Sequence, residues 1–269
     1  MAGPYRRRTG PGCASAAACR ARFFLLSMRF RNSLLPPFLA VAFVALVLLL
    51  AWDATGGDLW AAGLFGTRFG FPLRENWWLT AVVHQGGKNL SWVLVIALLV
   101  AVWWPVGVLR RLSRGERWQL VLSVLASVAA ITLLKHGNHT SCPWDIQAFG
   151  GVATYVSHWD WGARDGGPGG CFPAGHASAA FAFLGGWFVL RRRAPRAATV
   201  WLVLTLLAGA VFGLGQQLRG AHYLSHTLWT AWICWVVGGA IDATVQAWKA
   251  RRSARAETML RARVNLNET

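Results

Sequence analysis

The chain has 269 residues, of which 55% are hydrophobic and only 14% are charged. The apolar residues come in long unbroken blocks, which is typical of membrane proteins rather than soluble ones. A formal net charge of +17 would suggest nucleic acid as the partner of a soluble protein. Here the basic residues form short clusters between the apolar blocks, with no nucleic-acid-binding motif. We therefore expect no nucleic-acid partner and interpret the charge as a signal of membrane topology.

Residues 1–33 are rich in arginine, alanine and glycine and are predicted to form a basic cytoplasmic arm. Met28 stands directly before the first apolar block, so it is an alternative start, and the arm is then an over-extension. A cleaved signal peptide is not expected, because the first apolar run continues at full spanning length.

Six apolar blocks predict six transmembrane helices across a hydrocarbon core of about 30 Å. Their approximate limits are 34–52, 89–109, 118–135, 174–190, 198–215 and 224–242. We expect an all-α membrane domain over residues 34–245, followed by a basic cytoplasmic tail over 246–269. The segment "RENWWLTAVVHQ" (74–85) predicts a short interfacial helix before the second span.

Basic clusters such as "RRLSRGER" (110–117) and "RRRAPR" (191–196) occupy every second connection. The positive-inside rule then places both termini in the cytoplasm. The connections 53–88, 136–173 and 216–223 fall on the outer, periplasmic face. The sequence thus predicts a multi-pass protein of a bacterial inner membrane, embedded in the phospholipid bilayer, and does not predict an oligomeric state.

Two cysteines, Cys142 and Cys171, fall in the same predicted outer connection. An oxidising compartment permits a disulfide between them. Two free thiols, or a zinc site that includes nearby histidines, are the alternatives.

Ionisable residues interrupt the apolar pattern at one predicted membrane face: Lys135, His176, and the group Arg219, His222 and His226. Each has a simple structural interpretation. A lone lysine at a helix end extends to the interface, a Pro-Ala-Gly segment before His176 suits a helix start, and two histidines four apart can bind a metal. Such residues are costly in a membrane and tend to pair or to act. Their convergence therefore predicts a functional site.

In order and spacing, these segments resemble the signatures of the type 2 phosphatidic acid phosphatase family, membrane lipid phosphate phosphatases related to vanadium haloperoxidases. The family has a lysine followed after six residues by Arg-Pro, then Pro-Ser-Gly-His, then Ser-Arg with a histidine six residues later and an aspartate four after that. Here Lys135 is followed by Cys-Pro (142–143), and "PAGH" ends at His176. His222 aligns with the nucleophile and His226 with the aspartate. The resemblance extends from about residue 30 to 245.

The resemblance implies a reaction and its residues. His222 attacks phosphorus to form a phosphohistidine, His176 protonates the leaving group, and Lys135 and Gly175 hold the phosphate, with no metal or other cofactor. Water then releases phosphate, which makes the protein a hydrolase of a membrane lipid phosphate or diphosphate. The alternatives are a lipid-to-lipid phosphotransferase and a non-catalytic lipid-binding or transport protein.

Candidate substrates implied by the resemblance are undecaprenyl diphosphate, phosphatidylglycerol phosphate, phosphatidic acid and the phosphates of lipid A. The sequence does not choose among them.

Several positions depart from the family pattern. Cys142 stands where the first signature has an arginine, Ala174 replaces the serine, and Gln216 occupies the second arginine position. A bridge between Cys142 and Cys171 would tie the loop of the first signature to that of the second.

Other residues are predicted to compensate for the missing arginines. On a helix, Arg219 would lie about one turn before His222 on nearly the same face, within reach of the phosphate. His136 and His139 are predicted as further phosphate donors. His226 is expected to hydrogen-bond His222 and fix its tautomer, although a histidine cannot supply the negative charge of an aspartate.

Overall fold

The structure, a computed structural model, describes residues 35–267. The predicted basic arm, 1–33, lies outside these residues. Residues 35–41 fall in a different unit from the described residues after them, and the description of packing below concerns residues 42–267. The described chain is helical and contains no β-strand.

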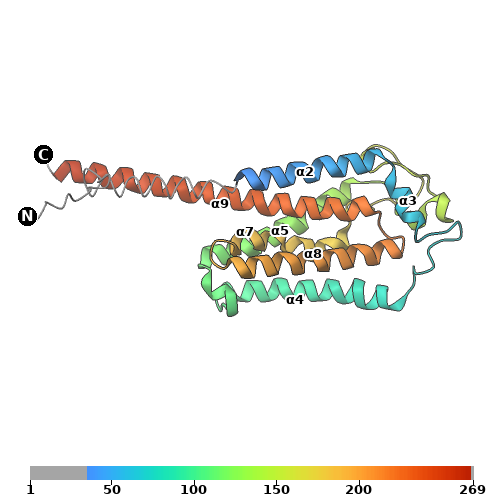
Figure 1. Ribbon diagram of the computed structural model, residues 1–269, viewed down its shortest axis with the longest axis horizontal. Helices are drawn as coiled ribbons and strands as arrows, with labels where there is room; N and C mark the ends of the chain where they lie inside the picture. The colour runs from blue at the N-terminus through green and yellow to red at the C-terminus, as the bar shows by residue number, and fades with distance from the viewer. Residues whose placement is uncertain (1–34, 268–269) are drawn as a thin grey trace, which may run out of the picture. The chain divides into compact units, whose positions relative to one another are not determined.

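Figure 1 labels the α-helices of the described residues except α6. Their bounds are α2 (Leu35–Ala54), α3 (Gly57–Gly63), α4 (Gly87–Val100), α5 (Arg114–Gly137), α6 (Gly175–Phe181), α7 (Gly185–Leu190), α8 (Pro195–Leu218) and α9 (Leu224–Asn267). A π-helix, η1 (Trp78–Gly86), leads into α4. Short 3₁₀ turns are η2 (Gly107–Arg111), η3 (Pro143–Asp145), η4 (Gln147–Phe149) and η5 (Ala182–Leu184).

Four of the described helices are long and apolar enough to cross a membrane: Trp78–Val100, Arg114–Gly137, Pro195–Leu218 and Leu224–Met259. A fifth span results if the pair Phe38–Ala54 and Gly57–Gly63, bent by 73°, crosses as one unit. This suggests a multi-pass membrane protein. The stretch Gly175–Leu190 is apolar but shorter, so six spans remain a prediction.

The second long helix differs from its predicted limits. Residues 78–85, which were predicted as part of a separate interfacial helix, belong to η1, which continues directly into α4. Gly86 and Gly87 do not interrupt it, since both keep helical backbone angles. A Cβ at Gly87 would lie 2.6 Å from the ring of Phe212, so this glycine allows α4 and α8 to pack closely. The continuation places His84 on the long helix.

The last helix is also longer than predicted. Beyond Asp242 the apolar pattern ends, but α9 continues to Asn267 and extends past α4, α5, α7 and α8 in Figure 1. The added segment is rich in alanine, arginine and other good helix formers, which explains why the loss of apolar residues does not end the helix.

The packing of the bundle brings the signature residues to one end of it. The C-terminal end of α5, the N-terminal end of α6 and the loop between α8 and α9 lie together at the right in Figure 1. α7 and α9 are in close contact at two glycines, where a Cβ on Gly238 would lie 2.8 Å from Cα of Gly185. The close contact fixes the short α6–α7 stretch against α9.

Candidate active site

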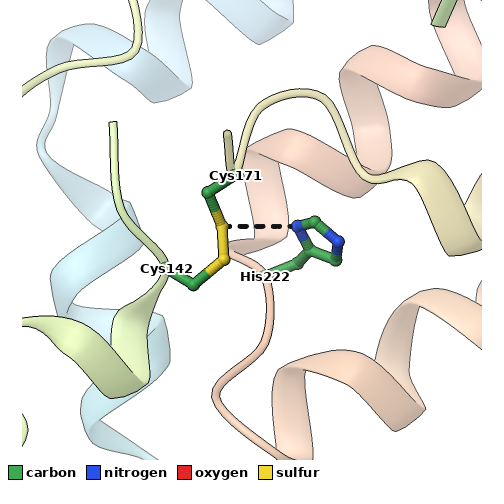
Figure 2. Close-up of side chains that lie close together, drawn as sticks. All are labelled: Cys142, Cys171 and His222. Atoms are coloured by element: carbon green, nitrogen blue, oxygen red, sulfur yellow. Dashed lines mark hydrogen bonds between the residues drawn. A yellow bond between two sulfur atoms is a disulfide. The ribbon is translucent and has the colours of Figure 1, made fainter. Parts of the chain in front are cut away.

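A disulfide holds together the two loops that cover the site. Cys142 and Cys171 are joined with an S–S distance of 2.10 Å (Figure 2), the pairing that the sequence left open beside free thiols and zinc. The backbone N–H of Gly170 donates to the carbonyl of Asn138 (3.1 Å), and that of Cys171 donates to the carbonyl of Thr140 (2.9 Å). The loop after α5 is therefore fixed to the segment that leads into α6.

His222 lies directly against this disulfide. Its side chain is buried, and its Nδ1 is 3.5 Å from Sγ of Cys171 (Figure 2). Burial is the main reason that the pKa of His222 lies well below 6.5. The positive charge of Lys135 lowers the pKa further, whereas a backbone hydrogen bond with Cys171 raises it. The ring is thus neutral, which is the form that a nucleophile requires.

His226, at the family's aspartate position, does not orient His222 as predicted. Its Nδ1 lies 3.2 Å from the carbonyl oxygen of Cys171, and the rings of the two histidines are 6.0 Å apart. The reason is that α9 begins at Leu224, so His222 precedes the helix and does not share a face with His226. In the described structure the Nδ1 atoms of both histidines face Cys171.

The prediction that Arg219 and His222 share a helix is wrong. α8 ends one residue before Arg219, and Gly220 adopts a left-handed φ of 76° that turns the chain. The Arg219 side chain nevertheless remains at the site. Its Nε donates to the carbonyl of Arg74 (2.9 Å), its Nη1 donates to Oε1 of Gln216 (3.2 Å), and Nη1 lies 3.5 Å from Nδ1 of His84.

His84 belongs to the site but was missed in the sequence. Its ring centroid is 3.6 Å from that of His176, with the rings tilted by 68°. It therefore links His176 to Arg219. His84 lies on the π-helix η1, and such turns shift side chains away from the positions that α-helical spacing predicts. It carries no motif, and no spacing marked it out.

A cavity of about 450 Å³ lies between α4, α5 and α6, within the range of ligand pockets. One end of it is polar and is lined by Lys88, Lys135, His136, Gly170, Gly175 and His176. The remainder is largely apolar and is lined by residues that include Val95, Val124, Leu125, Val128, Ile131 and Phe183. A cationic end and an apolar body suit an amphiphile with an anionic headgroup.

The predicted phosphate ligands occupy different places around this cavity. Gly175 packs beside Lys135, since a Cβ there would lie 3.7 Å from Cδ of that lysine. His136 is exposed and lines the cavity, whereas His139 is exposed and does not. His222 does not line it either, and is buried beside the disulfide.

A buried carboxylate, that of Asp58, lies close to His158 and His226 and was not predicted. Asp58 accepts hydrogen bonds from the backbone N–H (3.0 Å) and from the hydroxyl of Ser225. Asp58, His158 and His226 form one set of potential metal ligands among the described residues. Both oxygens of this carboxylate already accept hydrogen bonds, so a metal would have to displace them. The other set comprises His222 and the two disulfide sulfurs, which are not thiolates.

Comparison with known proteins gives one family match. A family model described as the PAP2 superfamily matches residues 116–250. The match includes Lys135, His176 and His222, whereas His84 lies outside it. No curated protein and no solved structure gave a match.

Proposed function

This chain belongs to the PAP2 superfamily, and we propose that it is a membrane phosphatase that hydrolyses a phosphate or diphosphate monoester of a lipid. The observation that supports this most directly is that Lys135 and His176 line the polar end of a cavity whose remainder is largely apolar. A lipid phosphate has the same two parts. Its headgroup needs cations and its chain needs apolar contacts.

In the proposed reaction, Nε2 of neutral His222 attacks phosphorus and displaces the lipid oxygen, and His176 donates a proton to that oxygen. Lys135 stabilises the negative charge on the phosphoryl oxygens as the transition state forms. Water then attacks the phosphohistidine, which releases phosphate and restores His222. The proposal assigns no step to a metal.

The proposed topology has six spans, with Gly175–Leu190 as the fourth, in a bacterial inner membrane. Both termini are cytoplasmic and the site opens at the outer face. The basic clusters support this orientation. Residues 110–117 lie at the N-terminal end of α5, and Lys135 lies near its C-terminal end. Residues 191–196 follow α7, and His176 lies at the other end of the α6–α7 stretch.

The test is phosphate release by purified full-length protein from phosphatidic acid, phosphatidylglycerol phosphate and undecaprenyl diphosphate, without added metal and with a chelator. We expect release by the wild type and none by His222→Ala or His176→Ala. Arg251→Ala, an exposed change in the distal part of α9, is the control and should behave as the wild type.

Three results would contradict this proposal. Release that His222→Ala does not change would exclude the phosphohistidine, and loss of release with the chelator would indicate a metal-dependent reaction. Transfer of the phosphate to a second lipid instead of water would identify a phosphotransferase.

A further inference from the structure

The partner of Nδ1 in His222 determines whether the ring can act as a nucleophile. A neutral imidazole carries one proton, so Nε2 has a free lone pair only when the proton is on Nδ1. A buried Nδ1–H needs an acceptor. In the family pattern an aspartate four residues later occupies the place of that acceptor, but here the position holds His226, whose Nδ1 faces the Cys171 carbonyl.

The disulfide faces Nδ1 of His222, and the ring also interacts with the backbone of Cys171. Sγ of Cys171 lies 3.5 Å from this nitrogen, and Cys171 is completely buried. A disulfide sulfur carries no hydrogen, so it can only accept. With the bridge closed, the contact therefore favours the tautomer with the proton on Nδ1 and the lone pair on Nε2.

A free thiol at the same place would not make this selection. Its single hydrogen could point to Nδ1 of His222 or to the carbonyl oxygen of Ala221, which lies 3.4 Å from Sγ. The first arrangement moves the imidazole proton to Nε2 and removes the nucleophile. Opening the bridge therefore allows both tautomers.

We propose that the disulfide between Cys142 and Cys171 is a positioning element of the active site, which selects the nucleophilic tautomer of His222 and makes activity depend on the oxidised state. The part of this proposal that concerns activity rests on the function proposed above. The part that concerns the tautomer of His222 does not. Reduction by dithiothreitol transfers two electrons and two protons to the bridge, which gives two thiols and the cyclic disulfide of the reagent.

The first experiment measures the tautomer directly. In the full-length chain, Cys13, Cys19 and Cys234 are replaced by alanine so that the bridged pair alone can react. The histidines are labelled with ¹⁵N, and the nitrogen chemical shifts of His222, assigned with His222→Ala, report which nitrogen holds the proton. We expect Nδ1–H in the oxidised protein and a mixture after reduction. The same tautomer in both states would overturn the proposal.

The second experiment separates the acceptor from the cross-link. Phosphate release from phosphatidic acid is measured with oxidised protein, with reduced protein, and with reduced protein treated with methyl methanethiosulfonate. The reagent converts each thiol into a methyl disulfide, which again has no S–H but does not join the loops. We expect reduction to lower kcat about tenfold or more with little change in KM, and capping to restore it. Recovery only on closure of the bridge would mean that the cross-link alone matters and would exclude tautomer selection.

Matched variants give an independent comparison. The double change Cys142→Ala and Cys171→Ala removes the acceptor, whereas Cys142→Ser and Cys171→Ser introduces hydroxyls that can donate. We expect both to be less active than the oxidised wild type, with the serine pair lower, and neither to respond to reductant. An alanine pair as active as the wild type would overturn the proposal.

The outcomes for the two proposals are distinguishable. Phosphate release that reduction does not change would retain the phosphatase and exclude the role of the disulfide. A tautomer that changes on reduction, in a protein that releases no phosphate from any of the substrates, would retain the role of the disulfide and exclude the phosphatase.

Discussion

The two ends of the helical bundle differ in whether their basic side chains have carboxylate partners. At the end away from the candidate site, Asp242 is buried and accepts hydrogen bonds from Nη1 of Arg192 (2.7 Å), Nη2 of Arg191 (3.3 Å) and Nε2 of Gln119 (2.8 Å). In the same region, Nε of Arg193 lies 3.4 Å from Oε1 of Glu116. Each of these three arginines has a carboxylate partner.

At the other end, the three cations nearest the candidate site have no carboxylate partner among the described residues. Within residues 35–267, no carboxylate lies within 4.0 Å of Lys88, Lys135 or Arg219. Arg219 is held by a carbonyl, an amide and a histidine instead. A charge at a partly buried site is costly unless it is paired. The charges at one end are paired within the chain, and the unpaired cations at the other end agree with the anionic substrate proposed above.

The largest effect should come from the nucleophile. We expect His222→Ala to lower kcat by about 10⁴-fold or more, because no other group in the proposed reaction forms the phosphohistidine. Phosphate release measures this, with thermal unfolding as the check that the variant is folded. Activity within tenfold of the wild type would remove His222 from the mechanism.

Lys135→Gln should lower kcat/KM by about 1000-fold, since it removes a positive charge from the phosphoryl oxygens. The same change should not destabilise the fold, because the lysine has no carboxylate partner to leave behind. A variant that unfolds at a lower temperature and keeps its activity would contradict the proposed difference between the two ends of the bundle.

Asp242→Asn should show the opposite pattern. The change keeps the shape of the side chain but leaves Arg191 and Arg192 without a counter-charge, so we expect the free energy of unfolding to fall by about 2–3 kcal/mol. The value is below that for a fully buried pair, because the Arg192 side chain is 27% exposed. Denaturant unfolding in detergent measures it, and activity per folded molecule should be unchanged.

His84→Gln should lower kcat/KM about tenfold, because the glutamine no longer packs on the His176 ring or faces Arg219. Val82→Ala, on the same π-helix but exposed, is the matched control. Equal activity of the two variants would show that His84 has no part in the site.

The pH dependence should be the smallest effect. Because burial holds the pKa of His222 well below 6.5, kcat/KM should not show an acid limb from this residue near 6.5, only at lower pH. The unfolded chain takes up a proton at this histidine near 6.5 and the folded chain does not, so the free energy of unfolding should fall as the pH drops below that value. A pH–rate profile tests the absence of the acid limb near 6.5, and unfolding at several pH values tests the fall in the free energy of unfolding.

Much of the fold could be predicted from the sequence because the apolar blocks are long. Helices α5, α8 and the α6–α7 stretch begin and end within a few residues of their expected limits. The errors occurred where composition and backbone disagree. The interfacial helix predicted over 74–85 and the span predicted from residue 89 are one continuous helix, because Gly86 and Gly87 keep helical angles. The end of the apolar pattern at Asp242 suggested a helix end that helix propensity overrides.

The candidate site could be predicted only where motifs marked it. Lys135, His176 and His222 were found by their spacing, whereas His84 and Asp58 lie in the first connection, which carries no motif. The position of Arg219 depended on one backbone angle. The left-handed turn at Gly220 separates α8 from α9, and a sequence pattern of the surrounding residues does not reveal that the turn falls between Arg219 and His222.

The bridge between Cys142 and Cys171 also links the site to the way the protein is made. The two cysteines lie on either side of a loop that belongs to one predicted face of the membrane, and they are 29 residues apart in the sequence. A newly made chain closes the bridge only after this loop has reached an oxidising compartment. A chain inserted the other way round would keep both thiols reduced. On the role proposed for the bridge, such a chain would have a poorly positioned His222, so phosphatase activity would report the direction of membrane insertion.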